Sequence, residues 1–382
     1  MSPGAIARSD LSEAGPALAD VLPSVATSLG VALAGRLARP PAKRAVVVLV
    51  DGLGHELLVR RRGHAPFLRS LADRTVAASC GFPSTTATSM ATFGTGLSTG
   101  QHGLLGYEVL DPARDQVFNE LTWEDGPVPE SWQPRRTVFE ALEAAGVAVT
   151  RIGPHFFDGS GLTRAALRGG RFVAARSLAE RVEATLQAVR ATPAAVVYLY
   201  WGDVDKVGHV HGCESWQWGD ELETVDRGLA ELAARLPRDC SLTITADHGM
   251  VDCLPEDRLD VAAIPALAAG LRHYAGEPRA PQLHCLPGAV DDVRAAWQEV
   301  LGDRADVRTR ADFVAGGLLG EVTDDHLGRV GDLMVTMKAR YAVVDSRVHR
   351  PELIALVGLH GSTTPDEVLV PVVHLPAAAA LG

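Results

Sequence analysis

The sequence predicts an α/β fold in which a mostly parallel sheet is sandwiched between helices, with a small inserted α+β cap subdomain. Two observations predict it. Short, almost continuous apolar runs alternate with helical patterns along much of the chain, and such runs are typical of parallel strands that helices cover on both faces. Acidic residues also follow several of these runs directly, as expected for a ligand site beyond the carboxyl ends of a parallel sheet.

The individual elements can be assigned in chain order from the apolar periodicity. The expected strands are 45–50, 147–152, 195–200, 242–245, 333–337 and 341–344. The expected helices are 137–145, 177–190, 216–236 and 290–301.

The domain organisation follows from where this alternation stops. Residues 253–344 contain five prolines, all before the helical pattern at 290–301, so we expect an inserted cap there. The catalytic domain would then comprise 41–252 and 345–382. Residues 1–40 would form a leader packed on the core, because acidic residues interrupt its apolar stretches too early for a signal peptide.

Composition excludes several classes of protein. The 382 residues carry 36 Lys and Arg against 47 Asp and Glu, a net charge of −11, which argues against a stable nucleic-acid partner. No apolar run approaches the length of about 18 residues that a membrane span needs. The five cysteines are scattered and odd in number, so neither a disulfide framework nor a thiolate zinc site is expected. We therefore expect a cytoplasmic protein without a membrane partner.

Carboxylates follow three of the expected strands. Asp51 comes directly after 45–50, Asp205 lies shortly after 195–200, and Asp247 lies shortly after 242–245. Singly, each has an ordinary explanation as a turn or helix-capping residue. Together they would place unpaired negative charges on one edge of the sheet, and a shared cation resolves that repulsion.

Three histidines complete the candidate ligand set. His209 follows Asp205 by four residues, so one helical turn would put both on the same face. His248 adjoins Asp247, and His360 lies in a loop near the end of the chain. Mixed carboxylate and imidazole ligands without cysteine favour two divalent metal ions, Zn²⁺ first and Mn²⁺ or Fe as alternatives. A lone loop histidine such as His360 is weak evidence by itself.

The segment 82–96, FPSTTATSMATFGTG, is rich in hydroxyl residues. A hydroxyl at a helix start lies beside free backbone N–H groups that attract an anion, and it can act as a nucleophile. The alternative is a hydroxyl-rich helix cap with no catalytic role.

Taken in order, these motifs resemble the alkaline phosphatase superfamily, and within it the nucleotide pyrophosphatase/phosphodiesterase branch, from about Ala45 to Val373. The resemblance is carried by VVLVDGLG at 47–54, FPSTTATSMATFGTG at 82–96, STGQHG at 98–103, DVDKVGH at 203–209, ADHGM at 246–250 and LHGS at 359–362. It implies an alkaline-phosphatase-like fold and a hydrolase that cleaves phosphodiester or pyrophosphate bonds of small nucleotide-like substrates.

The resemblance also assigns roles to residues. One metal ion would be held by Asp205, His209 and His360, and the other by Asp51, Asp247 and His248, with Thr86 bridging or adjoining the second. Thr86 would be the nucleophile, with Thr85 as runner-up. It would attack phosphorus to form a phosphothreonine, which water then hydrolyses.

Substrate contacts are predicted less directly. The asparagine that many members of this branch place about twenty residues after the nucleophile aligns with Tyr107, so either Tyr107 or Asn119 would donate to a phosphate oxygen. Phe156 and Phe157 follow the strand 147–152 and are placed to stack a base, or else to plug a loop.

Other functions fit the same site. A phosphonate (C–P) hydrolase or a phosphomonoesterase would use the same two metal ions, and a metal-stabilised binding protein would keep the ligands without catalysis. A sulfatase is disfavoured because the CxPxR-like arginine is missing, and a phosphate mutase of this superfamily is disfavoured because Ser84 is poorly placed as a nucleophile.

Overall fold

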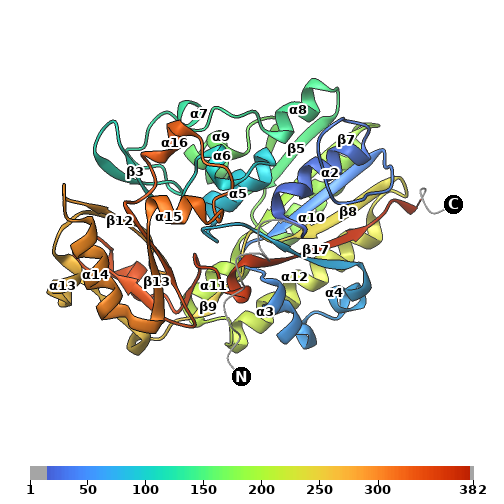
Figure 1. The fold of residues 1–382 in the computed structure, drawn as a ribbon. Helices are drawn as coiled ribbons and strands as arrows, with labels where there is room; N and C mark the ends of the chain where they lie inside the picture. Colours follow the sequence, from blue (N-terminus) through green and yellow to red (C-terminus); the bar gives the residue numbers. More distant parts are fainter. Residues whose placement is uncertain (1–14, 379–382) are drawn as a thin grey trace.

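A computed structural model describes residues 15–378 and builds them around a seven-stranded sheet (Figure 1). In spatial order its strands are β2 (Thr75–Ser79), β17 (Leu369–Leu375), β8 (Cys240–Thr245), β1 (Arg44–Val50), β7 (Ala195–Trp201), β5 (Ala148–Gly153) and β6 (Arg171–Ala174). From β8 to β6 all neighbours are parallel, and only β17 runs antiparallel to its neighbours β2 and β8. The predicted mostly parallel sheet is confirmed.

The register of the central strands aligns their carboxyl ends. β1 pairs with β7 so that Val50 lies opposite Trp201, and with β8 so that Leu49 lies opposite Thr245. Six of the seven residues of β1 are buried, as expected for a Val-rich strand in the middle of a parallel sheet. The three loops that follow β1, β7 and β8 therefore emerge side by side.

Helices flank the sheet in two groups. The first group consists of α10 (Leu178–Arg190), α11 (Asp203–His211) and α12 (Trp216–Arg235), in which α12 contacts the other two and α10 also contacts β7. The second group consists of α2 (Val21–Ser28), α5 (Thr86–Thr95), α8 (Val138–Ala144) and α9 (Gly161–Ala166), in which α5 contacts the other three. α8 and α10 begin one residue later than predicted, because Thr137 and Ser177 are extended and cap the helices through their hydroxyl oxygens.

A second, antiparallel sheet stands beside the first (Figure 1). Its strands are, in spatial order, β13 (Ala305–Thr309), β14 (Leu333–Met337), β12 (Ala280–Cys285), β11 (Leu271–Glu277), β3 (Glu108–Asp111) and β4 (Gln116–Asn119). α13 (Pro265–Ala268) and α14 (Val290–Leu301) pack on it through a separate apolar cluster around Trp297 and Leu283.

The boundaries of this second layer differ from the predicted cap 253–344. β3 and β4 lie far earlier in the chain, yet Gly276 of β11 pairs with Glu108 of β3 and so extends the sheet. The predicted strand 341–344 is β15 (Ala342–Val344), which pairs instead with β10 (Arg258–Asp260) in a separate two-stranded sheet. Edge pairing between distant segments leaves no trace in local periodicity, so the sequence did not show it.

The segment before β1 belongs to the main core. Leu18, Val21 and Leu22 are fully buried there. Residues 1–14 of the predicted leader lie outside the described part of the chain.

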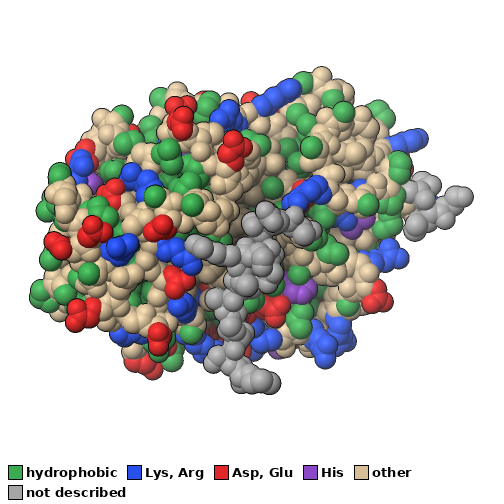
Figure 2. Space-filling view, in the orientation of Figure 1, with side chains coloured by type: hydrophobic (Ala, Val, Ile, Leu, Met, Phe, Trp, Pro, Cys, Tyr) green, Lys and Arg blue, Asp and Glu red, His purple; other side chains and the backbone are tan. Residues whose placement is uncertain are grey.

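The remaining elements are short. They include α3 (His55–Arg60), α4 (Pro66–Ser70), α6 (Thr99–His102), α7 (Pro129–Trp132), β9 (Val251–Asp252), α15 (Arg310–Ala315), α16 (Asp324–Leu327), α17 (Pro351–Ile354), β16 (Gly358–Leu359) and α18 (Pro365–Val368). Across residues 15–378 no helix has both the length and the apolar character to cross a membrane. On the face in Figure 2, acidic and basic side chains are interspersed.

Candidate active site

Three neighbouring strands deliver the predicted carboxylates to one edge of the large sheet. Asp51 follows β1, Asp205 lies in the first turn of α11 after β7, and Asp247 follows β8. Gly52 permits the close approach of the first two loops, since a Cβ at this position would lie 2.8 Å from the Cα of Asp205. Its φ of +72° also favours glycine.

The three predicted histidines face the same space with their Nε2 atoms free of backbone partners. The Nδ1 atoms of His209, His248 and His360 hydrogen-bond the carbonyl oxygens of Gly358 (2.7 Å), Gly249 (3.0 Å) and Ser84 (2.9 Å), respectively. A carbonyl can only accept, so Nδ1 carries the proton in each case. This arrangement orients imidazoles as metal ligands through Nε2.

The candidate ligand atoms form two overlapping groups. Those of Asp51, Asp247 and His248 lie within 4.8 Å of one another, as do those of Asp205, His248 and His360. His209 joins the second group through Asp205, with 3.2 Å between its Nε2 and the Asp205 Oδ2. All six residues are therefore brought together, and His248 stands between the two groups, its ring stacked on that of His360 at 3.7 Å.

One oxygen of each carboxylate is buried without a partner among the described residues. These atoms are Oδ1 of Asp51, Oδ1 of Asp205 and Oδ2 of Asp247. The second oxygen of Asp247 accepts from the backbone N–H groups of Gly52 (3.1 Å) and His248 (3.0 Å). Unpaired buried carboxylate oxygens facing imidazole nitrogens are the donor set of a divalent transition-metal site, and these residues fit such an ion.

Electrostatics supports the same interpretation. Burial, followed by the charges of Asp247 and Asp205, raises the pKa of Asp51 well above its usual range. Burial also raises the pKa of Asp247. For Asp205, burial is outweighed by the nearby His209, which lowers its pKa. Burial and the neighbouring His248 lower the pKa of His360, which favours a neutral imidazole with an available lone pair. The site thus concentrates negative charge that a cation would stabilise.

The predicted nucleophile stands at this site. Thr86 is the first residue of α5, and its Oγ1 lies 3.1 Å from the Nε2 of His248. The first-turn N–H groups of α5 make no intrahelical bonds, so they favour an anion next to that hydroxyl. Ser84 is fully buried, donates to the carbonyl of Ser362 and accepts from Gly361 N, so its hydroxyl is already occupied. Thr85, the runner-up, is buried before the helix.

Two cavities open from Thr86. One, of about 390 Å³, is lined by Asp51 and by aromatic side chains that include Phe157 and Tyr200. The other, of about 260 Å³, is lined by Asp205, His209, His360 and Tyr107. Thr86 thus borders both cavities.

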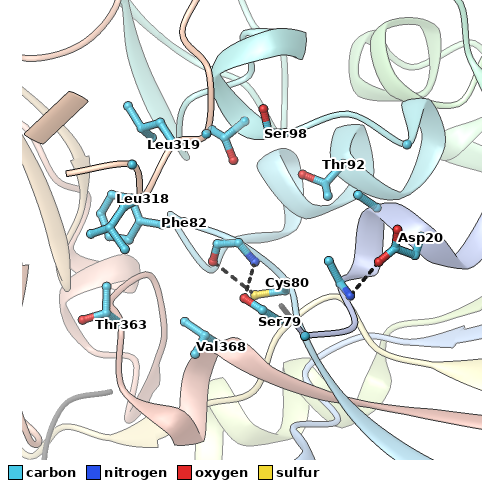
Figure 3. Close-up of a pocket in the computed structure, with 18 of the residues that line it drawn as sticks. Asp20, Ser79, Cys80, Phe82, Thr92, Ser98, Leu318, Leu319, Thr363 and Val368 are labelled. Carbon is cyan, nitrogen blue, oxygen red and sulfur yellow. Dashed lines mark hydrogen bonds between the residues drawn. The ribbon is translucent and has the colours of Figure 1, made fainter. Parts of the chain in front are cut away.

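A further cavity of about 320 Å³, shown in Figure 3, contains none of the predicted ligands. Several of its polar side chains already have partners. Asp20 accepts from Ala17 N and Arg36 Nε (2.9 Å each), and the Thr92 hydroxyl is 3.0 Å from the Nε2 of His102. The site around Thr86 differs from this cavity because its buried carboxylates have oxygen atoms without partners in the described structure.

A family model described as type I phosphodiesterase / nucleotide pyrophosphatase matches residues 45–363. That range includes every predicted ligand and both cavities. The chain belongs to this family. Its members are phosphodiesterase and pyrophosphatase hydrolases.

Solved structures of ectonucleotide pyrophosphatase/phosphodiesterase 5 share the fold of this type I phosphodiesterase family member. The murine protein aligns with a TM-score of 0.69 at 19% identity, over 87% of this chain and 89% of that chain. The human protein gives a TM-score of 0.69 at 18% identity, over 87% of both chains. An inactive variant of the murine protein in complex with AMP gives 0.70 at 19% identity, over 88% of this chain and 90% of that one. At this identity the likeness shows the fold.

Curated relatives match over shorter stretches. Phosphopentomutase of Deinococcus radiodurans is 32% identical over 122 residues, which are 31% of this chain and 29% of that protein. Human ectonucleotide pyrophosphatase/phosphodiesterase family member 5 is 25% identical over 213 residues, 53% of this chain and 43% of that protein. The matches span less than half the length of these relatives.

The predicted substrate contacts separate into two kinds. Tyr107, Phe156 and Phe157 line the cavities beside Thr86. Asn119 does not line them: it borders a neighbouring hollow, and its Oδ1 accepts from the backbone N–H groups of Leu121 and Thr122 (2.9 Å each). The structure therefore gives Asn119 a turn-capping role at the end of β4.

Two further residues lie at the site that the sequence analysis did not predict to be there. Tyr200, in β7, donates from its hydroxyl to the Oδ2 of Asp51. Glu277, at the end of β11, lines the smaller cavity, and its Cγ would lie 2.5 Å from a Cβ at Gly361, next to His360. Glu277 comes from the second sheet, whose packing against this site local sequence does not reveal.

The buried Glu277 makes stability depend on pH. Burial raises its pKa to about 8, whereas in an unfolded chain a Glu titrates near 4.3. The folded state holds this proton more tightly, so its contribution to stability is fully present below pH ~4 and is lost as pH rises through about 8. Glu277→Gln should therefore raise Tm relative to wild type, with a gain that grows from pH 5 to pH 9. Scanning calorimetry of both proteins, with the exposed Glu256→Gln as control, checks this. A Tm difference that does not change with pH would contradict it.

Proposed function

We propose that this protein is a two-metal phosphodiesterase or nucleotide pyrophosphatase that cleaves small nucleotide-like substrates through a phosphothreonine on Thr86. One observation carries the proposal. Three unpartnered buried carboxylate oxygens and three oriented imidazoles converge beside the hydroxyl of Thr86, at the free N-terminus of α5.

The metal ions would be divided as the sequence resemblance implies. Asp51, Asp247 and His248 would hold one ion next to Thr86, and Asp205, His209 and His360 would hold the other. Zn²⁺ fits this oxygen and nitrogen set best, with Mn²⁺ or Fe as alternatives. When bound, the two cations would supply positive charge beside the Thr86 hydroxyl and the phosphate oxygens.

The chain's own groups would perform the rest of the reaction. The first-turn N–H groups of α5 would bind a phosphate oxygen and hold phosphorus in front of the Thr86 Oγ1. Attack by this oxygen would form a P–O bond to Thr86 and break the bond to the leaving alcohol or phosphate, which takes up the proton that the Thr86 hydroxyl loses. Water would then attack the phosphothreonine from the vacated side. Its oxygen and one proton leave with the product phosphate monoester, and its other proton restores the Thr86 hydroxyl.

The size of the site supports a small phosphate-ester partner and not a nucleic-acid chain. The two cavities total only a few hundred Å³, and the net charge of −11 disfavours a polyanion. We also place the protein in the cytoplasm, a proposal that the unpaired buried cysteines fit.

Turnover of matched substrates tests the proposal. Bis(4-nitrophenyl) phosphate and 4-nitrophenyl phosphate should be compared on protein reloaded with Zn²⁺ or Mn²⁺ and assayed for bound metal. We expect about two ions per chain and a kcat/KM at least tenfold higher for the diester. A preference for the monoester would move the assignment to a phosphomonoesterase. Bound metal without turnover of either ester would favour a phosphonate hydrolase or a binding protein. No bound metal after reloading would refute the two-metal site.

A further inference from the structure

Arg151 is an unexplained cation inside the larger cavity beside Thr86. It lies in the middle of β5, opposite Phe172 of β6 and Tyr198 of β7. The same cavity is also lined by Asp51 and Thr86. Arg151 therefore shares one cavity of about 390 Å³ with the proposed site of the reaction.

The guanidinium of Arg151 has hydrogen-bond donors that no acceptor in the described part of the chain satisfies. Its Nη2 donates to the carbonyl of Gly170 at 3.4 Å, a long hydrogen bond. Its Nε and Nη1 atoms are buried, and neither has a hydrogen-bond partner within residues 15–378. Buried donors without acceptors are rare in folded proteins, and each costs free energy unless a ligand satisfies it.

The charge is also uncompensated. The charges of Asp158 and Glu143 act on Arg151, but among residues 15–378 it forms no ion pair with either of them. Burial lowers the pKa of Arg151, and the ring of Phe172 lies 5.8 Å from its Cζ. The buried Arg181 and Arg329 place their guanidinium N–H groups on backbone carbonyls, whereas Arg151 leaves Nε and Nη1 without acceptors in the described structure.

The walls around it suit a planar, apolar segment. Phe157 packs against Tyr200 with ring centroids 5.2 Å apart, and against Phe156 at 4.9 Å. Tyr200 in turn donates to Asp51. A ligand that runs from Thr86 towards Arg151 would thus pass aromatic side chains before meeting one cation.

We propose that Arg151 determines specificity by binding an anionic oxygen group, a carboxylate or a second phosphate, at the far end of the substrate arm that remains esterified after cleavage. This inference rests on the proposed phosphodiesterase function and narrows its substrate class. The substrate would carry its reacting phosphate at Thr86, an aromatic or planar segment next to it, and an oxyanion at Arg151. A charge-assisted hydrogen bond of this kind is among the strong ones in proteins.

A pair of synthetic diesters tests the proposal. 4-Nitrophenyl benzyl phosphate and 4-nitrophenyl 3-carboxybenzyl phosphate differ only in the carboxylate of the retained arm and release the same nitrophenolate. We expect wild type to favour the carboxylated diester by about 10- to 100-fold in kcat/KM, mainly through KM. Arg151→Met should remove this preference, and Arg151→Lys should restore part of it. Arg171→Met, on the neighbouring strand with its side chain exposed, is the matched control and should keep the preference.

Binding without turnover separates this inference from the function on which it rests. Thr86→Ala, alone and combined with Arg151→Met, should be titrated calorimetrically with 3-carboxybenzyl phosphonate and with benzyl phosphonate. Tighter binding of the carboxylated ligand that disappears with Arg151→Met would support the role of Arg151 even if neither diester is hydrolysed. Equal affinity for the two ligands, or a preference that Arg151→Met leaves unchanged, would overturn it whether or not the protein is a phosphodiesterase. Thermal unfolding of Arg151→Met, expected near wild type, checks that the variant folds.

Discussion

Replacing Thr86 with alanine is expected to lower kcat for diester hydrolysis by about 10³-fold or more, with Tm and metal content close to wild type. The reason is that the Oγ1 of Thr86 is the hydroxyl that stands 3.1 Å from the Nε2 of His248, and loss of a nucleophile removes covalent catalysis. Alanine is a good helix former, and the Thr86 hydroxyl contacts the side chain of His248, not the backbone of α5, so the helix should be kept. Stopped assays with purified variants measure the change.

Two controls make this result specific. Thr85→Ala removes the adjacent hydroxyl, and Thr88→Ala removes a buried hydroxyl two residues into the same helix that has no partner in the described structure. Both should retain most of the turnover. Acid quenching of wild type during turnover, followed by mass spectrometry, should place a phosphate on the peptide containing Thr86. Loss of activity in Thr85→Ala with activity kept in Thr86→Ala would instead identify Thr85 as the nucleophile.

Replacing Asp51 with asparagine is expected to change stability and activity in opposite directions. In metal-free protein Asp51 is buried and repelled by Asp247 and Asp205, so removing its charge should raise Tm by a few degrees. Asparagine can still accept the hydrogen bond that Tyr200 donates to this side chain. The same change removes a metal ligand, so Zn²⁺ affinity should fall at least tenfold and turnover by about 10³-fold.

Thermal unfolding with and without Zn²⁺ measures both effects. Wild type should gain stability from bound metal, by about 2.7 kcal/mol at a free concentration one hundred times Kd, whereas Asp51→Asn should gain much less. Asp203→Asn is the matched control, because Asp203 lies two residues before Asp205 in the same helix but is exposed. A metal-free Asp51→Asn protein less stable than wild type would contradict the charge-repulsion account of the site.

The sequence by itself identified the acidic residues of the site and one of its histidines. Asp51, Asp205 and Asp247 each lie within a few residues of the end of an apolar run. Local spacing was therefore enough to place each of these residues at the end of a strand. Parallel pairing then forces those ends together, whatever the details of packing. The helical relation between Asp205 and His209 was equally local, and the structure shows it as a 3.2 Å contact. His360 was identified only through the family resemblance, because nothing local distinguishes a loop histidine.

Only the tertiary structure decided how these side chains share space and what surrounds them. It placed His248 between the two ligand groups, turned Asn119 to its own backbone, and joined β3 to β11 across more than 150 residues of chain. It also brought Glu277 and Arg151 to the two cavities beside Thr86. The physical reason is the same in each case: periodicity records which face of an element is buried, but the partner on that face is set by contacts between segments far apart in the chain.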